Sequence, residues 1–197
     1  MTLTFDEAKH EYRLSGQVIP SVTQVISDTV GHGWDAGQWY MDRGKQVHAA
    51  AALIAQGKSF KCDPRIDGYV EAIRKLFREH EIEVLGVEEK MCSKLYRYAG
   101  TLDLRCKFDG VRVIADYKNS LDEERCKLQL GGYCALRKSN PTHGIAVELH
   151  EDGTYKLGCD NGKPWSLARP RQEFLALLTT YNIRRRLKVK EERDAND

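Results

Sequence analysis

The clearest alternation of hydrophobic and polar residues in the chain runs from residue 101 to residue 118. Apolar residues occupy every second position on both sides of Asp109-Gly110. An Asp-Gly pair between two alternating runs predicts a β-hairpin closed by a two-residue turn. Such a turn pairs Phe108 with Val111. Because side chains point alternately to the two faces of a strand, one face of this hairpin is predicted to be apolar and buried, and the other to be polar.

Two carboxylates are predicted to meet on the polar face. Counting outward from the turn places Asp103 directly opposite Asp116, with their Cβ atoms about 5 Å apart. Like charges at that distance destabilise a sheet unless a cation compensates them, and a divalent metal is one such cation. Lys118 follows Asp116 by two residues, so its ammonium is expected on the same face. An ordinary strand face with Asp–Lys and Asp–Arg pairs is the alternative.

Helices and further strands are predicted on both sides of this hairpin. An alternating run from Thr2 to Val18 predicts an N-terminal hairpin, and Ser21 with Gln24 has the spacing of a capping box. Apolar residues spaced by three and four predict longer helices, one of which begins at Asp63-Pro64. The expected helices span about 35–56, 63–77, 122–138 and 171–190, and the expected strands 84–92, 145–149 and 154–157.

The order of the central elements, α–β–β–β–α–β, predicts an α/β fold with a central mixed sheet flanked by helices. A chain of 197 residues is expected to form one domain. Within it we expect an N-terminal hairpin and short helix (1–34), a core (35–160) and a C-terminal helix (170–193).

Composition narrows the class of protein. Hydrophobic residues make up 41% and charged residues 30% of the chain, as in ordinary globular proteins. The net charge is only +2, so a nucleic-acid surface would have to be local. Neither an apolar run of about 20 residues nor a secretory signal is seen, which predicts a protein of the cytoplasm without a membrane partner. The six cysteines form no C-x-x-C pair, so reduced thiols are expected rather than a zinc site.

The predicted carboxylate pair suits metal chemistry on phosphate esters. Asp103, Asp116 and the backbone carbonyl of Tyr117 are hard oxygen ligands of the kind that Mg²⁺ or Mn²⁺ prefers. The ammonium of Lys118 can neutralise a phosphate oxygen or orient the attacking water. Together these groups are the equipment for metal-assisted phosphodiester hydrolysis.

Five motifs in order give the chain a resemblance to a known family. They are R-G-K-Q-V-H ending at His48, G-V-E-E-K with Glu88, G-T-L-D-L with Asp103, I-A-D-Y-K-N-S with Asp116 and Lys118, and Q-L-G-G-Y from Gln129 to Tyr133. The set resembles the PD-(D/E)XK nuclease superfamily, specifically its RecB-like and phage-exonuclease branch. The opening I-P-S-V-T-Q-V-I is similar to leaders of phage and mitochondrial genome-maintenance exonucleases. The sequence departs from the pattern at Leu102, where proline often stands, and at Asn119, where threonine is frequent.

The resemblance implies a restriction-endonuclease-like core and a Mg²⁺- or Mn²⁺-dependent deoxyribonuclease. It implies that Glu88 and His48 join Asp103, Asp116 and the Tyr117 carbonyl around the metal. Glu88 and Glu89 point to opposite faces, and the family spacing favours Glu88. In this interpretation Lys118 and Gln129 act on the attacking water or the phosphate, and Tyr133 supports Gln129.

The branch further implies exonuclease action on DNA ends in recombination or repair, in a bacterial or phage-infected cell. The expected partner is DNA, single-stranded or with a free end, and a single-strand annealing or binding protein is a possible second one. The alternatives are a structure-specific endonuclease and a catalytically silent DNA-binding module. A hydrolase of small phosphate esters ranks last, because the chain has no Gly-rich phosphate loop.

Several basic and aromatic residues are candidates for contacting DNA, because cations neutralise phosphates and aromatic rings stack on bases. Solubility charges are the plain alternative. The candidates are Arg43, Lys45, Lys94, Tyr96, Arg97 and Arg125.

Two further features leave alternatives open. Gly131-Gly132 lies inside a predicted helix at a cost of about 2 kcal/mol relative to two alanines, which indicates close approach of the sheet, of a DNA backbone or of another helix. The basic run 184–190 either contacts DNA or complements the macrodipole at a helix C-terminus.

Overall fold

The computed structural model describes residues 2–7, 9–31, 38–137 and 142–194. The predicted helix start near Asp35 lies outside these residues, as does the predicted end of the next-to-last helix at Lys138. In chain order the elements are β1 (Leu3–Asp6), β2 (Glu11–Leu14), β3 (Gln17–Ile19), α1 (Val22–Val30), α2 (Gln38–Ala55), the 3-10 helix η1 (Pro64–Ile66), α3 (Asp67–Glu79), β4 (Ile82–Ser93), β5 (Tyr98–Phe108), β6 (Val111–Lys118), α4 (Glu123–Leu136), β7 (His143–Leu149), β8 (Tyr155–Gly158), β9 (Trp165–Ser166) and α5 (Ala168–Asp194).

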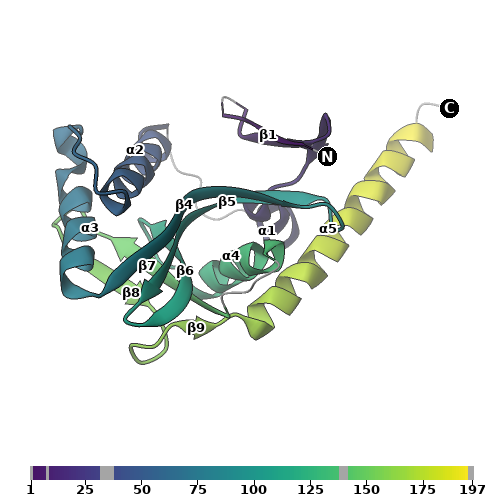
Figure 1. Cartoon of the computed structure of the whole chain (residues 1–197). Coiled ribbons are helices and arrows are strands. Elements are labelled where there is room, and N and C mark those ends of the chain that lie inside the picture. Colours follow the sequence, from purple (N-terminus) through teal and green to yellow (C-terminus); the bar gives the residue numbers. More distant parts are fainter. Residues whose placement is uncertain (1, 8, 32–37, 138–141, 195–197) are drawn as a thin grey trace.

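The main sheet is mixed, as predicted. Its strands follow the order β4-β5-β6-β7-β8, with β9 beside β7 (Figure 1). Strands β6 and β7 pair in parallel, while the other neighbours pair antiparallel. A parallel pair needs a crossover, and α4 supplies it. The series α3–β4–β5–β6–α4–β7 therefore confirms the predicted α/β class and element order. A separate sheet, β1-β2-β3, extends the predicted N-terminal hairpin by one strand.

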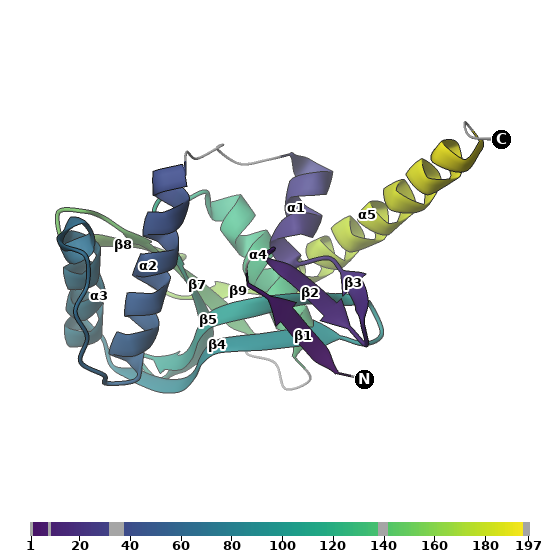
Figure 2. The same cartoon turned by 90° about the horizontal axis from the view of Figure 1, so that it is seen from above.

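The sheet is covered by helices on both faces (Figure 2). Val113, Ala115 and Tyr117 of β6 pack in one core with residues of α2 and α3. Ile114, between them, packs in a second core with residues of α1, α4 and α5. The face predicted to be polar is therefore not an open strand face at β6, because α4 covers it. Asp116 is consequently buried, with 2% of its surface exposed.

Capping residues mark the helix boundaries, and Ser21 and Asp63 are two that the sequence predicted. Ser21 caps α1 by accepting a hydrogen bond from the Gln24 backbone N–H at 3.0 Å. Asp63 caps η1 in the same manner through Arg65, and Asp122 caps α4. Gly57, with a φ of +67°, ends α2. The three N-caps satisfy backbone donors that the start of a helix leaves unpaired, so they set where α1, η1 and α4 begin.

The β4–β5 hairpin changes its packing partners partway along. Leu104 of β5 packs in the core with α2 and α3, whereas Leu102 packs in the core with α1, α4 and α5. On β4, Val87 and Met91 differ in the same way. Under strict alternation, residues two or four positions apart on a strand point to the same face. Leu102 and Leu104 would then share one core, and so would Val87 and Met91. The change falls at Asp103 and at the facing Glu88, whose φ of +49° departs from strand geometry.

The glycine pair in α4 serves helix packing. A Cβ atom on Gly131 would lie 2.4 Å from the backbone carbonyl carbon of Pro170 at the start of α5. A Cβ atom on Gly132 would lie 2.7 Å from Val22 of α1. Of the three predicted reasons for these glycines, close approach of neighbouring helices is the one that the structure confirms, and approach of the sheet or of DNA at these two residues is wrong.

Across the described residues, no helix combines the length and the apolar character that crossing a lipid bilayer requires.

Candidate active site

Asp103 and Asp116 lie just beyond the end of the β5–β6 ladder. The register runs from Phe108–Val111 at the turn to Leu104–Ala115, as predicted, and Asp103 faces Asp116 at the next position. There the Asp103 side chain replaces a backbone partner: its Oδ2 accepts a hydrogen bond from the Tyr117 N–H at 3.0 Å. The two carboxylates are thus held at the point where the strands part.

His48 on α2 is the first cationic partner in this site. Its Nδ1 lies 3.2 Å from Oδ2 of Asp103. The charge of Asp103 raises the pKa of His48 to about 9, although burial opposes the shift. Burial likewise disfavours the ionised Asp103, yet His48, the Tyr117 N–H and Lys118 outweigh it and lower the Asp103 pKa. At neutral pH this pair is an imidazolium with a carboxylate, so a metal ion would have to displace the proton before it bound Nδ1.

Glu88 on β4 completes a group of three potential ligands. One ligand atom each from His48, Glu88 and Asp103 lie within 4.8 Å of one another. Partial desolvation of the carboxylate, and then the charge of Asp103, raise the pKa of Glu88 to about 7, although the residue stays largely exposed. Its left-handed backbone is uncommon for a residue with a long side chain and costs about 1–3 kcal/mol. Strained residues of this kind cluster at functional sites.

Lys118, Asp116, Gln129 and Tyr133 form a second, connected group. The ammonium of Lys118 lies 2.6 Å from Oδ2 of Asp116 and donates to the Gln129 side-chain oxygen at 2.8 Å. The Gln129 amide donates to Oδ1 of Asp116 at 2.9 Å and to the Tyr133 hydroxyl at 3.0 Å. Burial raises the Asp116 pKa despite Lys118, and Asp116 in turn keeps the Lys118 pKa above its usual value. Gln129 and Tyr133, four residues apart on α4, thus both point at the strand ends.

The protein's own cations compensate both carboxylates. His48 neutralises Asp103 and Lys118 neutralises Asp116. A divalent metal, which the sequence suggested as a compensating cation, is therefore not needed to make the two facing carboxylates tolerable. The argument for a metal ion rests instead on the ligand atoms.

The ligand atoms fit a hard divalent cation. The carboxylate oxygens of Glu88 and Asp103 suit Mg²⁺ or Mn²⁺, whereas the imidazole nitrogen of His48 is a ligand more typical of zinc, iron or copper. Asp116 Oδ2 is buried and accepts no aligned hydrogen bond from the described residues, its contact with Lys118 being an ion pair only. Glu88 adds a third acidic group beside Asp103 and Asp116, whereas one histidine and one lysine pair with these carboxylates. Asp116 is not a member of the gathered group of three, so its part in a metal sphere, like that of the Tyr117 carbonyl, stays a prediction.

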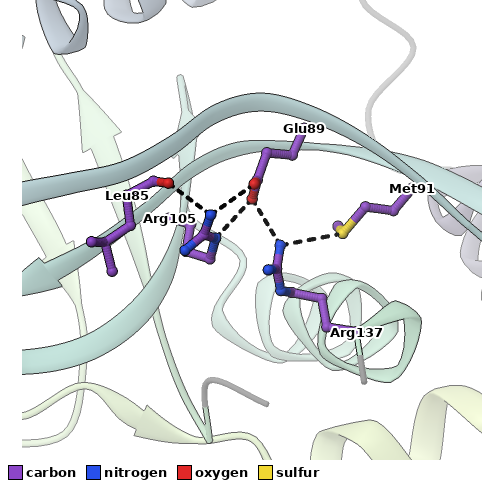
Figure 3. Close-up of polar contacts among 5 residues, drawn as sticks. All are labelled: Leu85, Glu89, Met91, Arg105 and Arg137. Atoms are coloured by element: carbon purple, nitrogen blue, oxygen red, sulfur yellow. Dashed lines mark hydrogen bonds and ion pairs between the residues drawn. The ribbon is translucent and has the colours of Figure 1, made fainter. Parts of the chain in front are cut away.

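Glu89 forms a separate network with Arg105 and Arg137 (Figure 3). Arg105 on β5 donates to both Glu89 oxygens at 2.9 Å, and Arg137 at the end of α4 donates to Oε2 at 2.8 Å. Arg105 also donates to the Leu85 carbonyl at 2.7 Å. These bonds lower the Glu89 pKa, with Arg105 the main cause. Of the two adjacent glutamates, Glu88 is thus the one that lies beside His48 and Asp103.

The residues predicted to contact DNA are not brought together. Lys94, Tyr96 and Arg97 lie in the turn between β4 and β5. Arg97 is six residues from Asp103, which is about 20 Å along a strand. In that turn Arg97 donates to the Gln17 side chain at 2.5 Å, so it braces the N-terminal sheet.

The other three DNA candidates lie on helices beside the site. Arg43 on α2 packs its guanidinium over the rings of Tyr40 and Tyr69, 4.9 Å from each centroid, while Lys45 is exposed. Arg125, in the first turn of α4, donates to the Gly31 carbonyl at 2.6 Å. These side chains are near the site helices, but whether they contact DNA stays a prediction.

Sequence reasoning did not single out Tyr12 as a site residue. Its hydroxyl shares a 2.7 Å hydrogen bond with Thr101 Oγ1. Burial first, and then the charges of Glu88 and Asp103, raise the pKa of Tyr12. The N-terminal sheet thus contacts β5 at Thr101, two residues before Asp103. Tyr12 belongs to an ordinary strand pattern with no motif around it, so the sequence alone offers no signal for this placement.

Comparisons with known proteins add little. No protein-family model and no curated protein matches the chain. Among solved structures, the crystal structure of LHK-Exo in complex with dAMP matches with a TM-score of 0.36 and 10% sequence identity, covering 89% of this chain and 94% of that one. A likeness this distant carries no weight for function, which has to rest on the residues of the site.

Proposed function

We propose that the chain is a metal-dependent nuclease that hydrolyses phosphodiester bonds of DNA. The observation that carries the proposal is the juxtaposition of two groups at the parted ends of β5 and β6. One group is a cluster of potential metal ligands, His48, Glu88 and Asp103. The other is a lysine held by a carboxylate and an amide, Lys118 with Asp116 and Gln129.

The roles follow from the chemistry of each group. Asp103, Asp116, Glu88 and His48, with the Tyr117 carbonyl, would hold Mg²⁺ or Mn²⁺. Such an ion would supply charge neutralisation at the phosphate and a more acidic water. Lys118 keeps a fixed positive charge where negative charge develops on the phosphoryl oxygens, which favours the transition state over the ground state. Gln129 fixes the Lys118 ammonium, and Tyr133 fixes the orientation of Gln129.

The finer form of the proposal follows the family resemblance: an exonuclease of phage type that acts on DNA ends in recombination or repair, in the cytoplasm. We take residues 1–197 as a single nuclease domain. A single-strand annealing or binding protein is its proposed partner. DNA with a free end is the proposed substrate, and Arg43, Lys45 and Arg125 beside the site are its proposed phosphate contacts.

The decisive test is Asp116→Asn. The substitution removes the charge opposite Lys118 and keeps the side-chain volume, so we expect loss of Mg²⁺-dependent digestion of end-labelled DNA with the fold retained. The matched control is Asp152→Asn in the exposed β7–β8 turn, which should digest normally. Undiminished digestion by the Asp116 variant would remove the proposal.

A second comparison separates exonuclease from endonuclease action. Linear and covalently closed circular single strands are incubated with the wild-type protein and Mg²⁺. An exonuclease needs an end and leaves the circle intact. Cutting of the circle would replace the exonuclease with a structure-specific endonuclease, while leaving the metal-dependent site in place.

A further inference from the structure

A surface groove runs between α1 and α5, away from the residues discussed so far. On α5, Tyr181, Arg184, Arg185 and Lys188 are spaced by three, one and three, which places them on one face of the helix. On α1, Gln24, Ser27 and Asp28 likewise share a face. These residues line a hollow of about 810 Å³ between the two helices. Figure 2 shows α5 passing α1 and continuing beyond the sheet.

The hollow adjoins a second one between α1 and the N-terminal sheet. The second, of about 440 Å³, is lined by residues of the N-terminal sheet and α1, among them Tyr12. The two share Val18, Gln24, Ser27 and Asp28. The Tyr12 hydroxyl shares a 2.7 Å hydrogen bond with Thr101, two residues before Asp103 on β5. The two hollows therefore adjoin along α1, and a wall residue of the second contacts the strand that carries Asp103.

Two of the three cations in the groove contact neighbouring groups: Arg185 hydrogen-bonds the Tyr181 hydroxyl, which leaves its positive charge in place, and Arg184 contacts α1. Arg184 donates to the Asp28 and Thr29 carbonyls, at 3.2 and 3.3 Å, and so caps the C-terminus of α1. The macrodipole of α5 does not explain the basic residues, because that helix continues to Asp194, about three turns past Arg184, and the effect fades within the last turn. The predicted placement of this run at a helix C-terminus is thus wrong for Arg184 and Arg185.

We propose that the α1–α5 groove binds the phosphate backbone of a single DNA strand that extends from the active site, with Arg185 and Lys188 as its phosphate contacts. Three basic side chains face one acidic one, Asp28, across the hollow, which complements a polyanion. Gln24 and Ser27 add neutral hydrogen-bonding groups along the path. The choice of DNA as the ligand rests on the proposed function, whereas the groove and its charge do not.

The test compares oligothymidylates of about six and about twenty nucleotides, one near the lower end and one beyond the upper end of typical single-strand site sizes. Binding is measured by fluorescence anisotropy in EDTA, where it does not depend on turnover. We expect Arg185→Gln with Lys188→Gln to weaken binding of the long strand about fivefold to tenfold and to leave the short one unchanged. The slope of log affinity against log salt for the long strand should fall by about 1.4, the value for two lost contacts on a single strand.

The matched control is Arg112→Gln with Lys156→Gln, two exposed cations on β6 and β8, which should bind both strands like the wild type. Equal weakening for both lengths, or no weakening, would overturn the inference. Digestion of the short strand with Mg²⁺ is read separately. Its failure in the wild-type protein would count against the proposed function, while the length-dependent binding would still support the groove.

Discussion

The side chain of Gln129 accepts a hydrogen bond from the ammonium of Lys118 at 2.8 Å. The same amide donates to Asp116, so one neutral side chain from α4 connects a cation and a carboxylate from β6. Lysine is flexible, and an ammonium that must meet a phosphate oxygen gains from being held in place. The helix crossover of the fold is thus part of the proposed chemistry.

Gln129→Ala is therefore expected to reduce Mg²⁺-dependent digestion tenfold to hundredfold, the usual effect of losing a partner that orients a site group. Steady-state rates on end-labelled DNA give the measurement. Gln172→Ala, on the exposed side of α5, is the control of the same residue type. Equal rates for both variants would show that Lys118 does not depend on Gln129.

Glu88 offers a test of backbone strain. Glu88→Gly and Glu88→Gln both remove the charge, but only glycine accepts a φ of +49° without a Cβ penalty. We expect the glycine variant to be about 1 kcal/mol more stable than the glutamine variant, although both lose digestion. Urea unfolding without divalent metal compares them. A glycine variant less stable than the glutamine variant would mean that Glu88 is not strained.

Glu89 is expected to stabilise the fold rather than act on substrate. Glu89→Gln leaves Arg105 and Arg137 without a carboxylate and should cost about 1–3 kcal/mol at neutral pH. Because the pKa of Glu89 is lowered in the folded state, this stabilisation is present above the unfolded value of about 4.5 and is lost as the pH falls below it. Thermal unfolding of both proteins between pH 7 and pH 3 should show the difference shrinking.

The control for Glu89 is Glu173→Gln, which breaks the solvent-exposed pair with Arg169. Exposed pairs contribute little, so this variant should unfold like the wild type at every pH. A Glu89 variant that shows the same pH profile as this control would contradict the structural role of the Glu89 cluster.

The cysteines should divide into two classes. Burial raises the pKa of Cys106 to about 12 and that of Cys126 to about 11, so at pH 8 the Cys106 thiolate is about one part in ten thousand. Brief iodoacetamide treatment of the native protein should modify the half-buried thiols and spare the buried ones, and peptide mass spectrometry locates the label. Modification of native Cys106 would contradict its burial. The half-buried thiols are Cys62, Cys92 and Cys159.

The sequence was sufficient for the local elements. The Asp109-Gly110 turn fixes the β5–β6 register, and Ser21, Asp63 and Asp122 set helix starts, because each acts through neighbours in the chain. Strand β9 is only two residues long and pairs with a distant strand, so no periodicity reveals it.

The site was predictable only in part. Counting along the hairpin predicts that Asp103 and Asp116 face each other. It does not predict which side chains from other elements contact them. The packing of α2 brings His48 to Asp103, and the packing of β2 brings Tyr12 close to the site. Neither placement follows from the local sequence. Period-two alternation also fails between Leu102 and Leu104, where the chain departs from the regular geometry that such counting assumes.

The irregular register of β4 comes from one extra residue. Between Val84 and Gly86 the pairing with β5 shifts by one residue, so Leu85 has no partner there. Deleting Leu85 would make Val84 and Gly86 consecutive opposite Cys106 and Arg105, so the ladder would become regular and both adjacent glutamates would keep their faces. What the deletion would remove is the Leu85 carbonyl, which accepts a hydrogen bond from Arg105. Inserting a residue after Gly86, by contrast, would require a second bulge or would turn the two glutamates to the opposite faces.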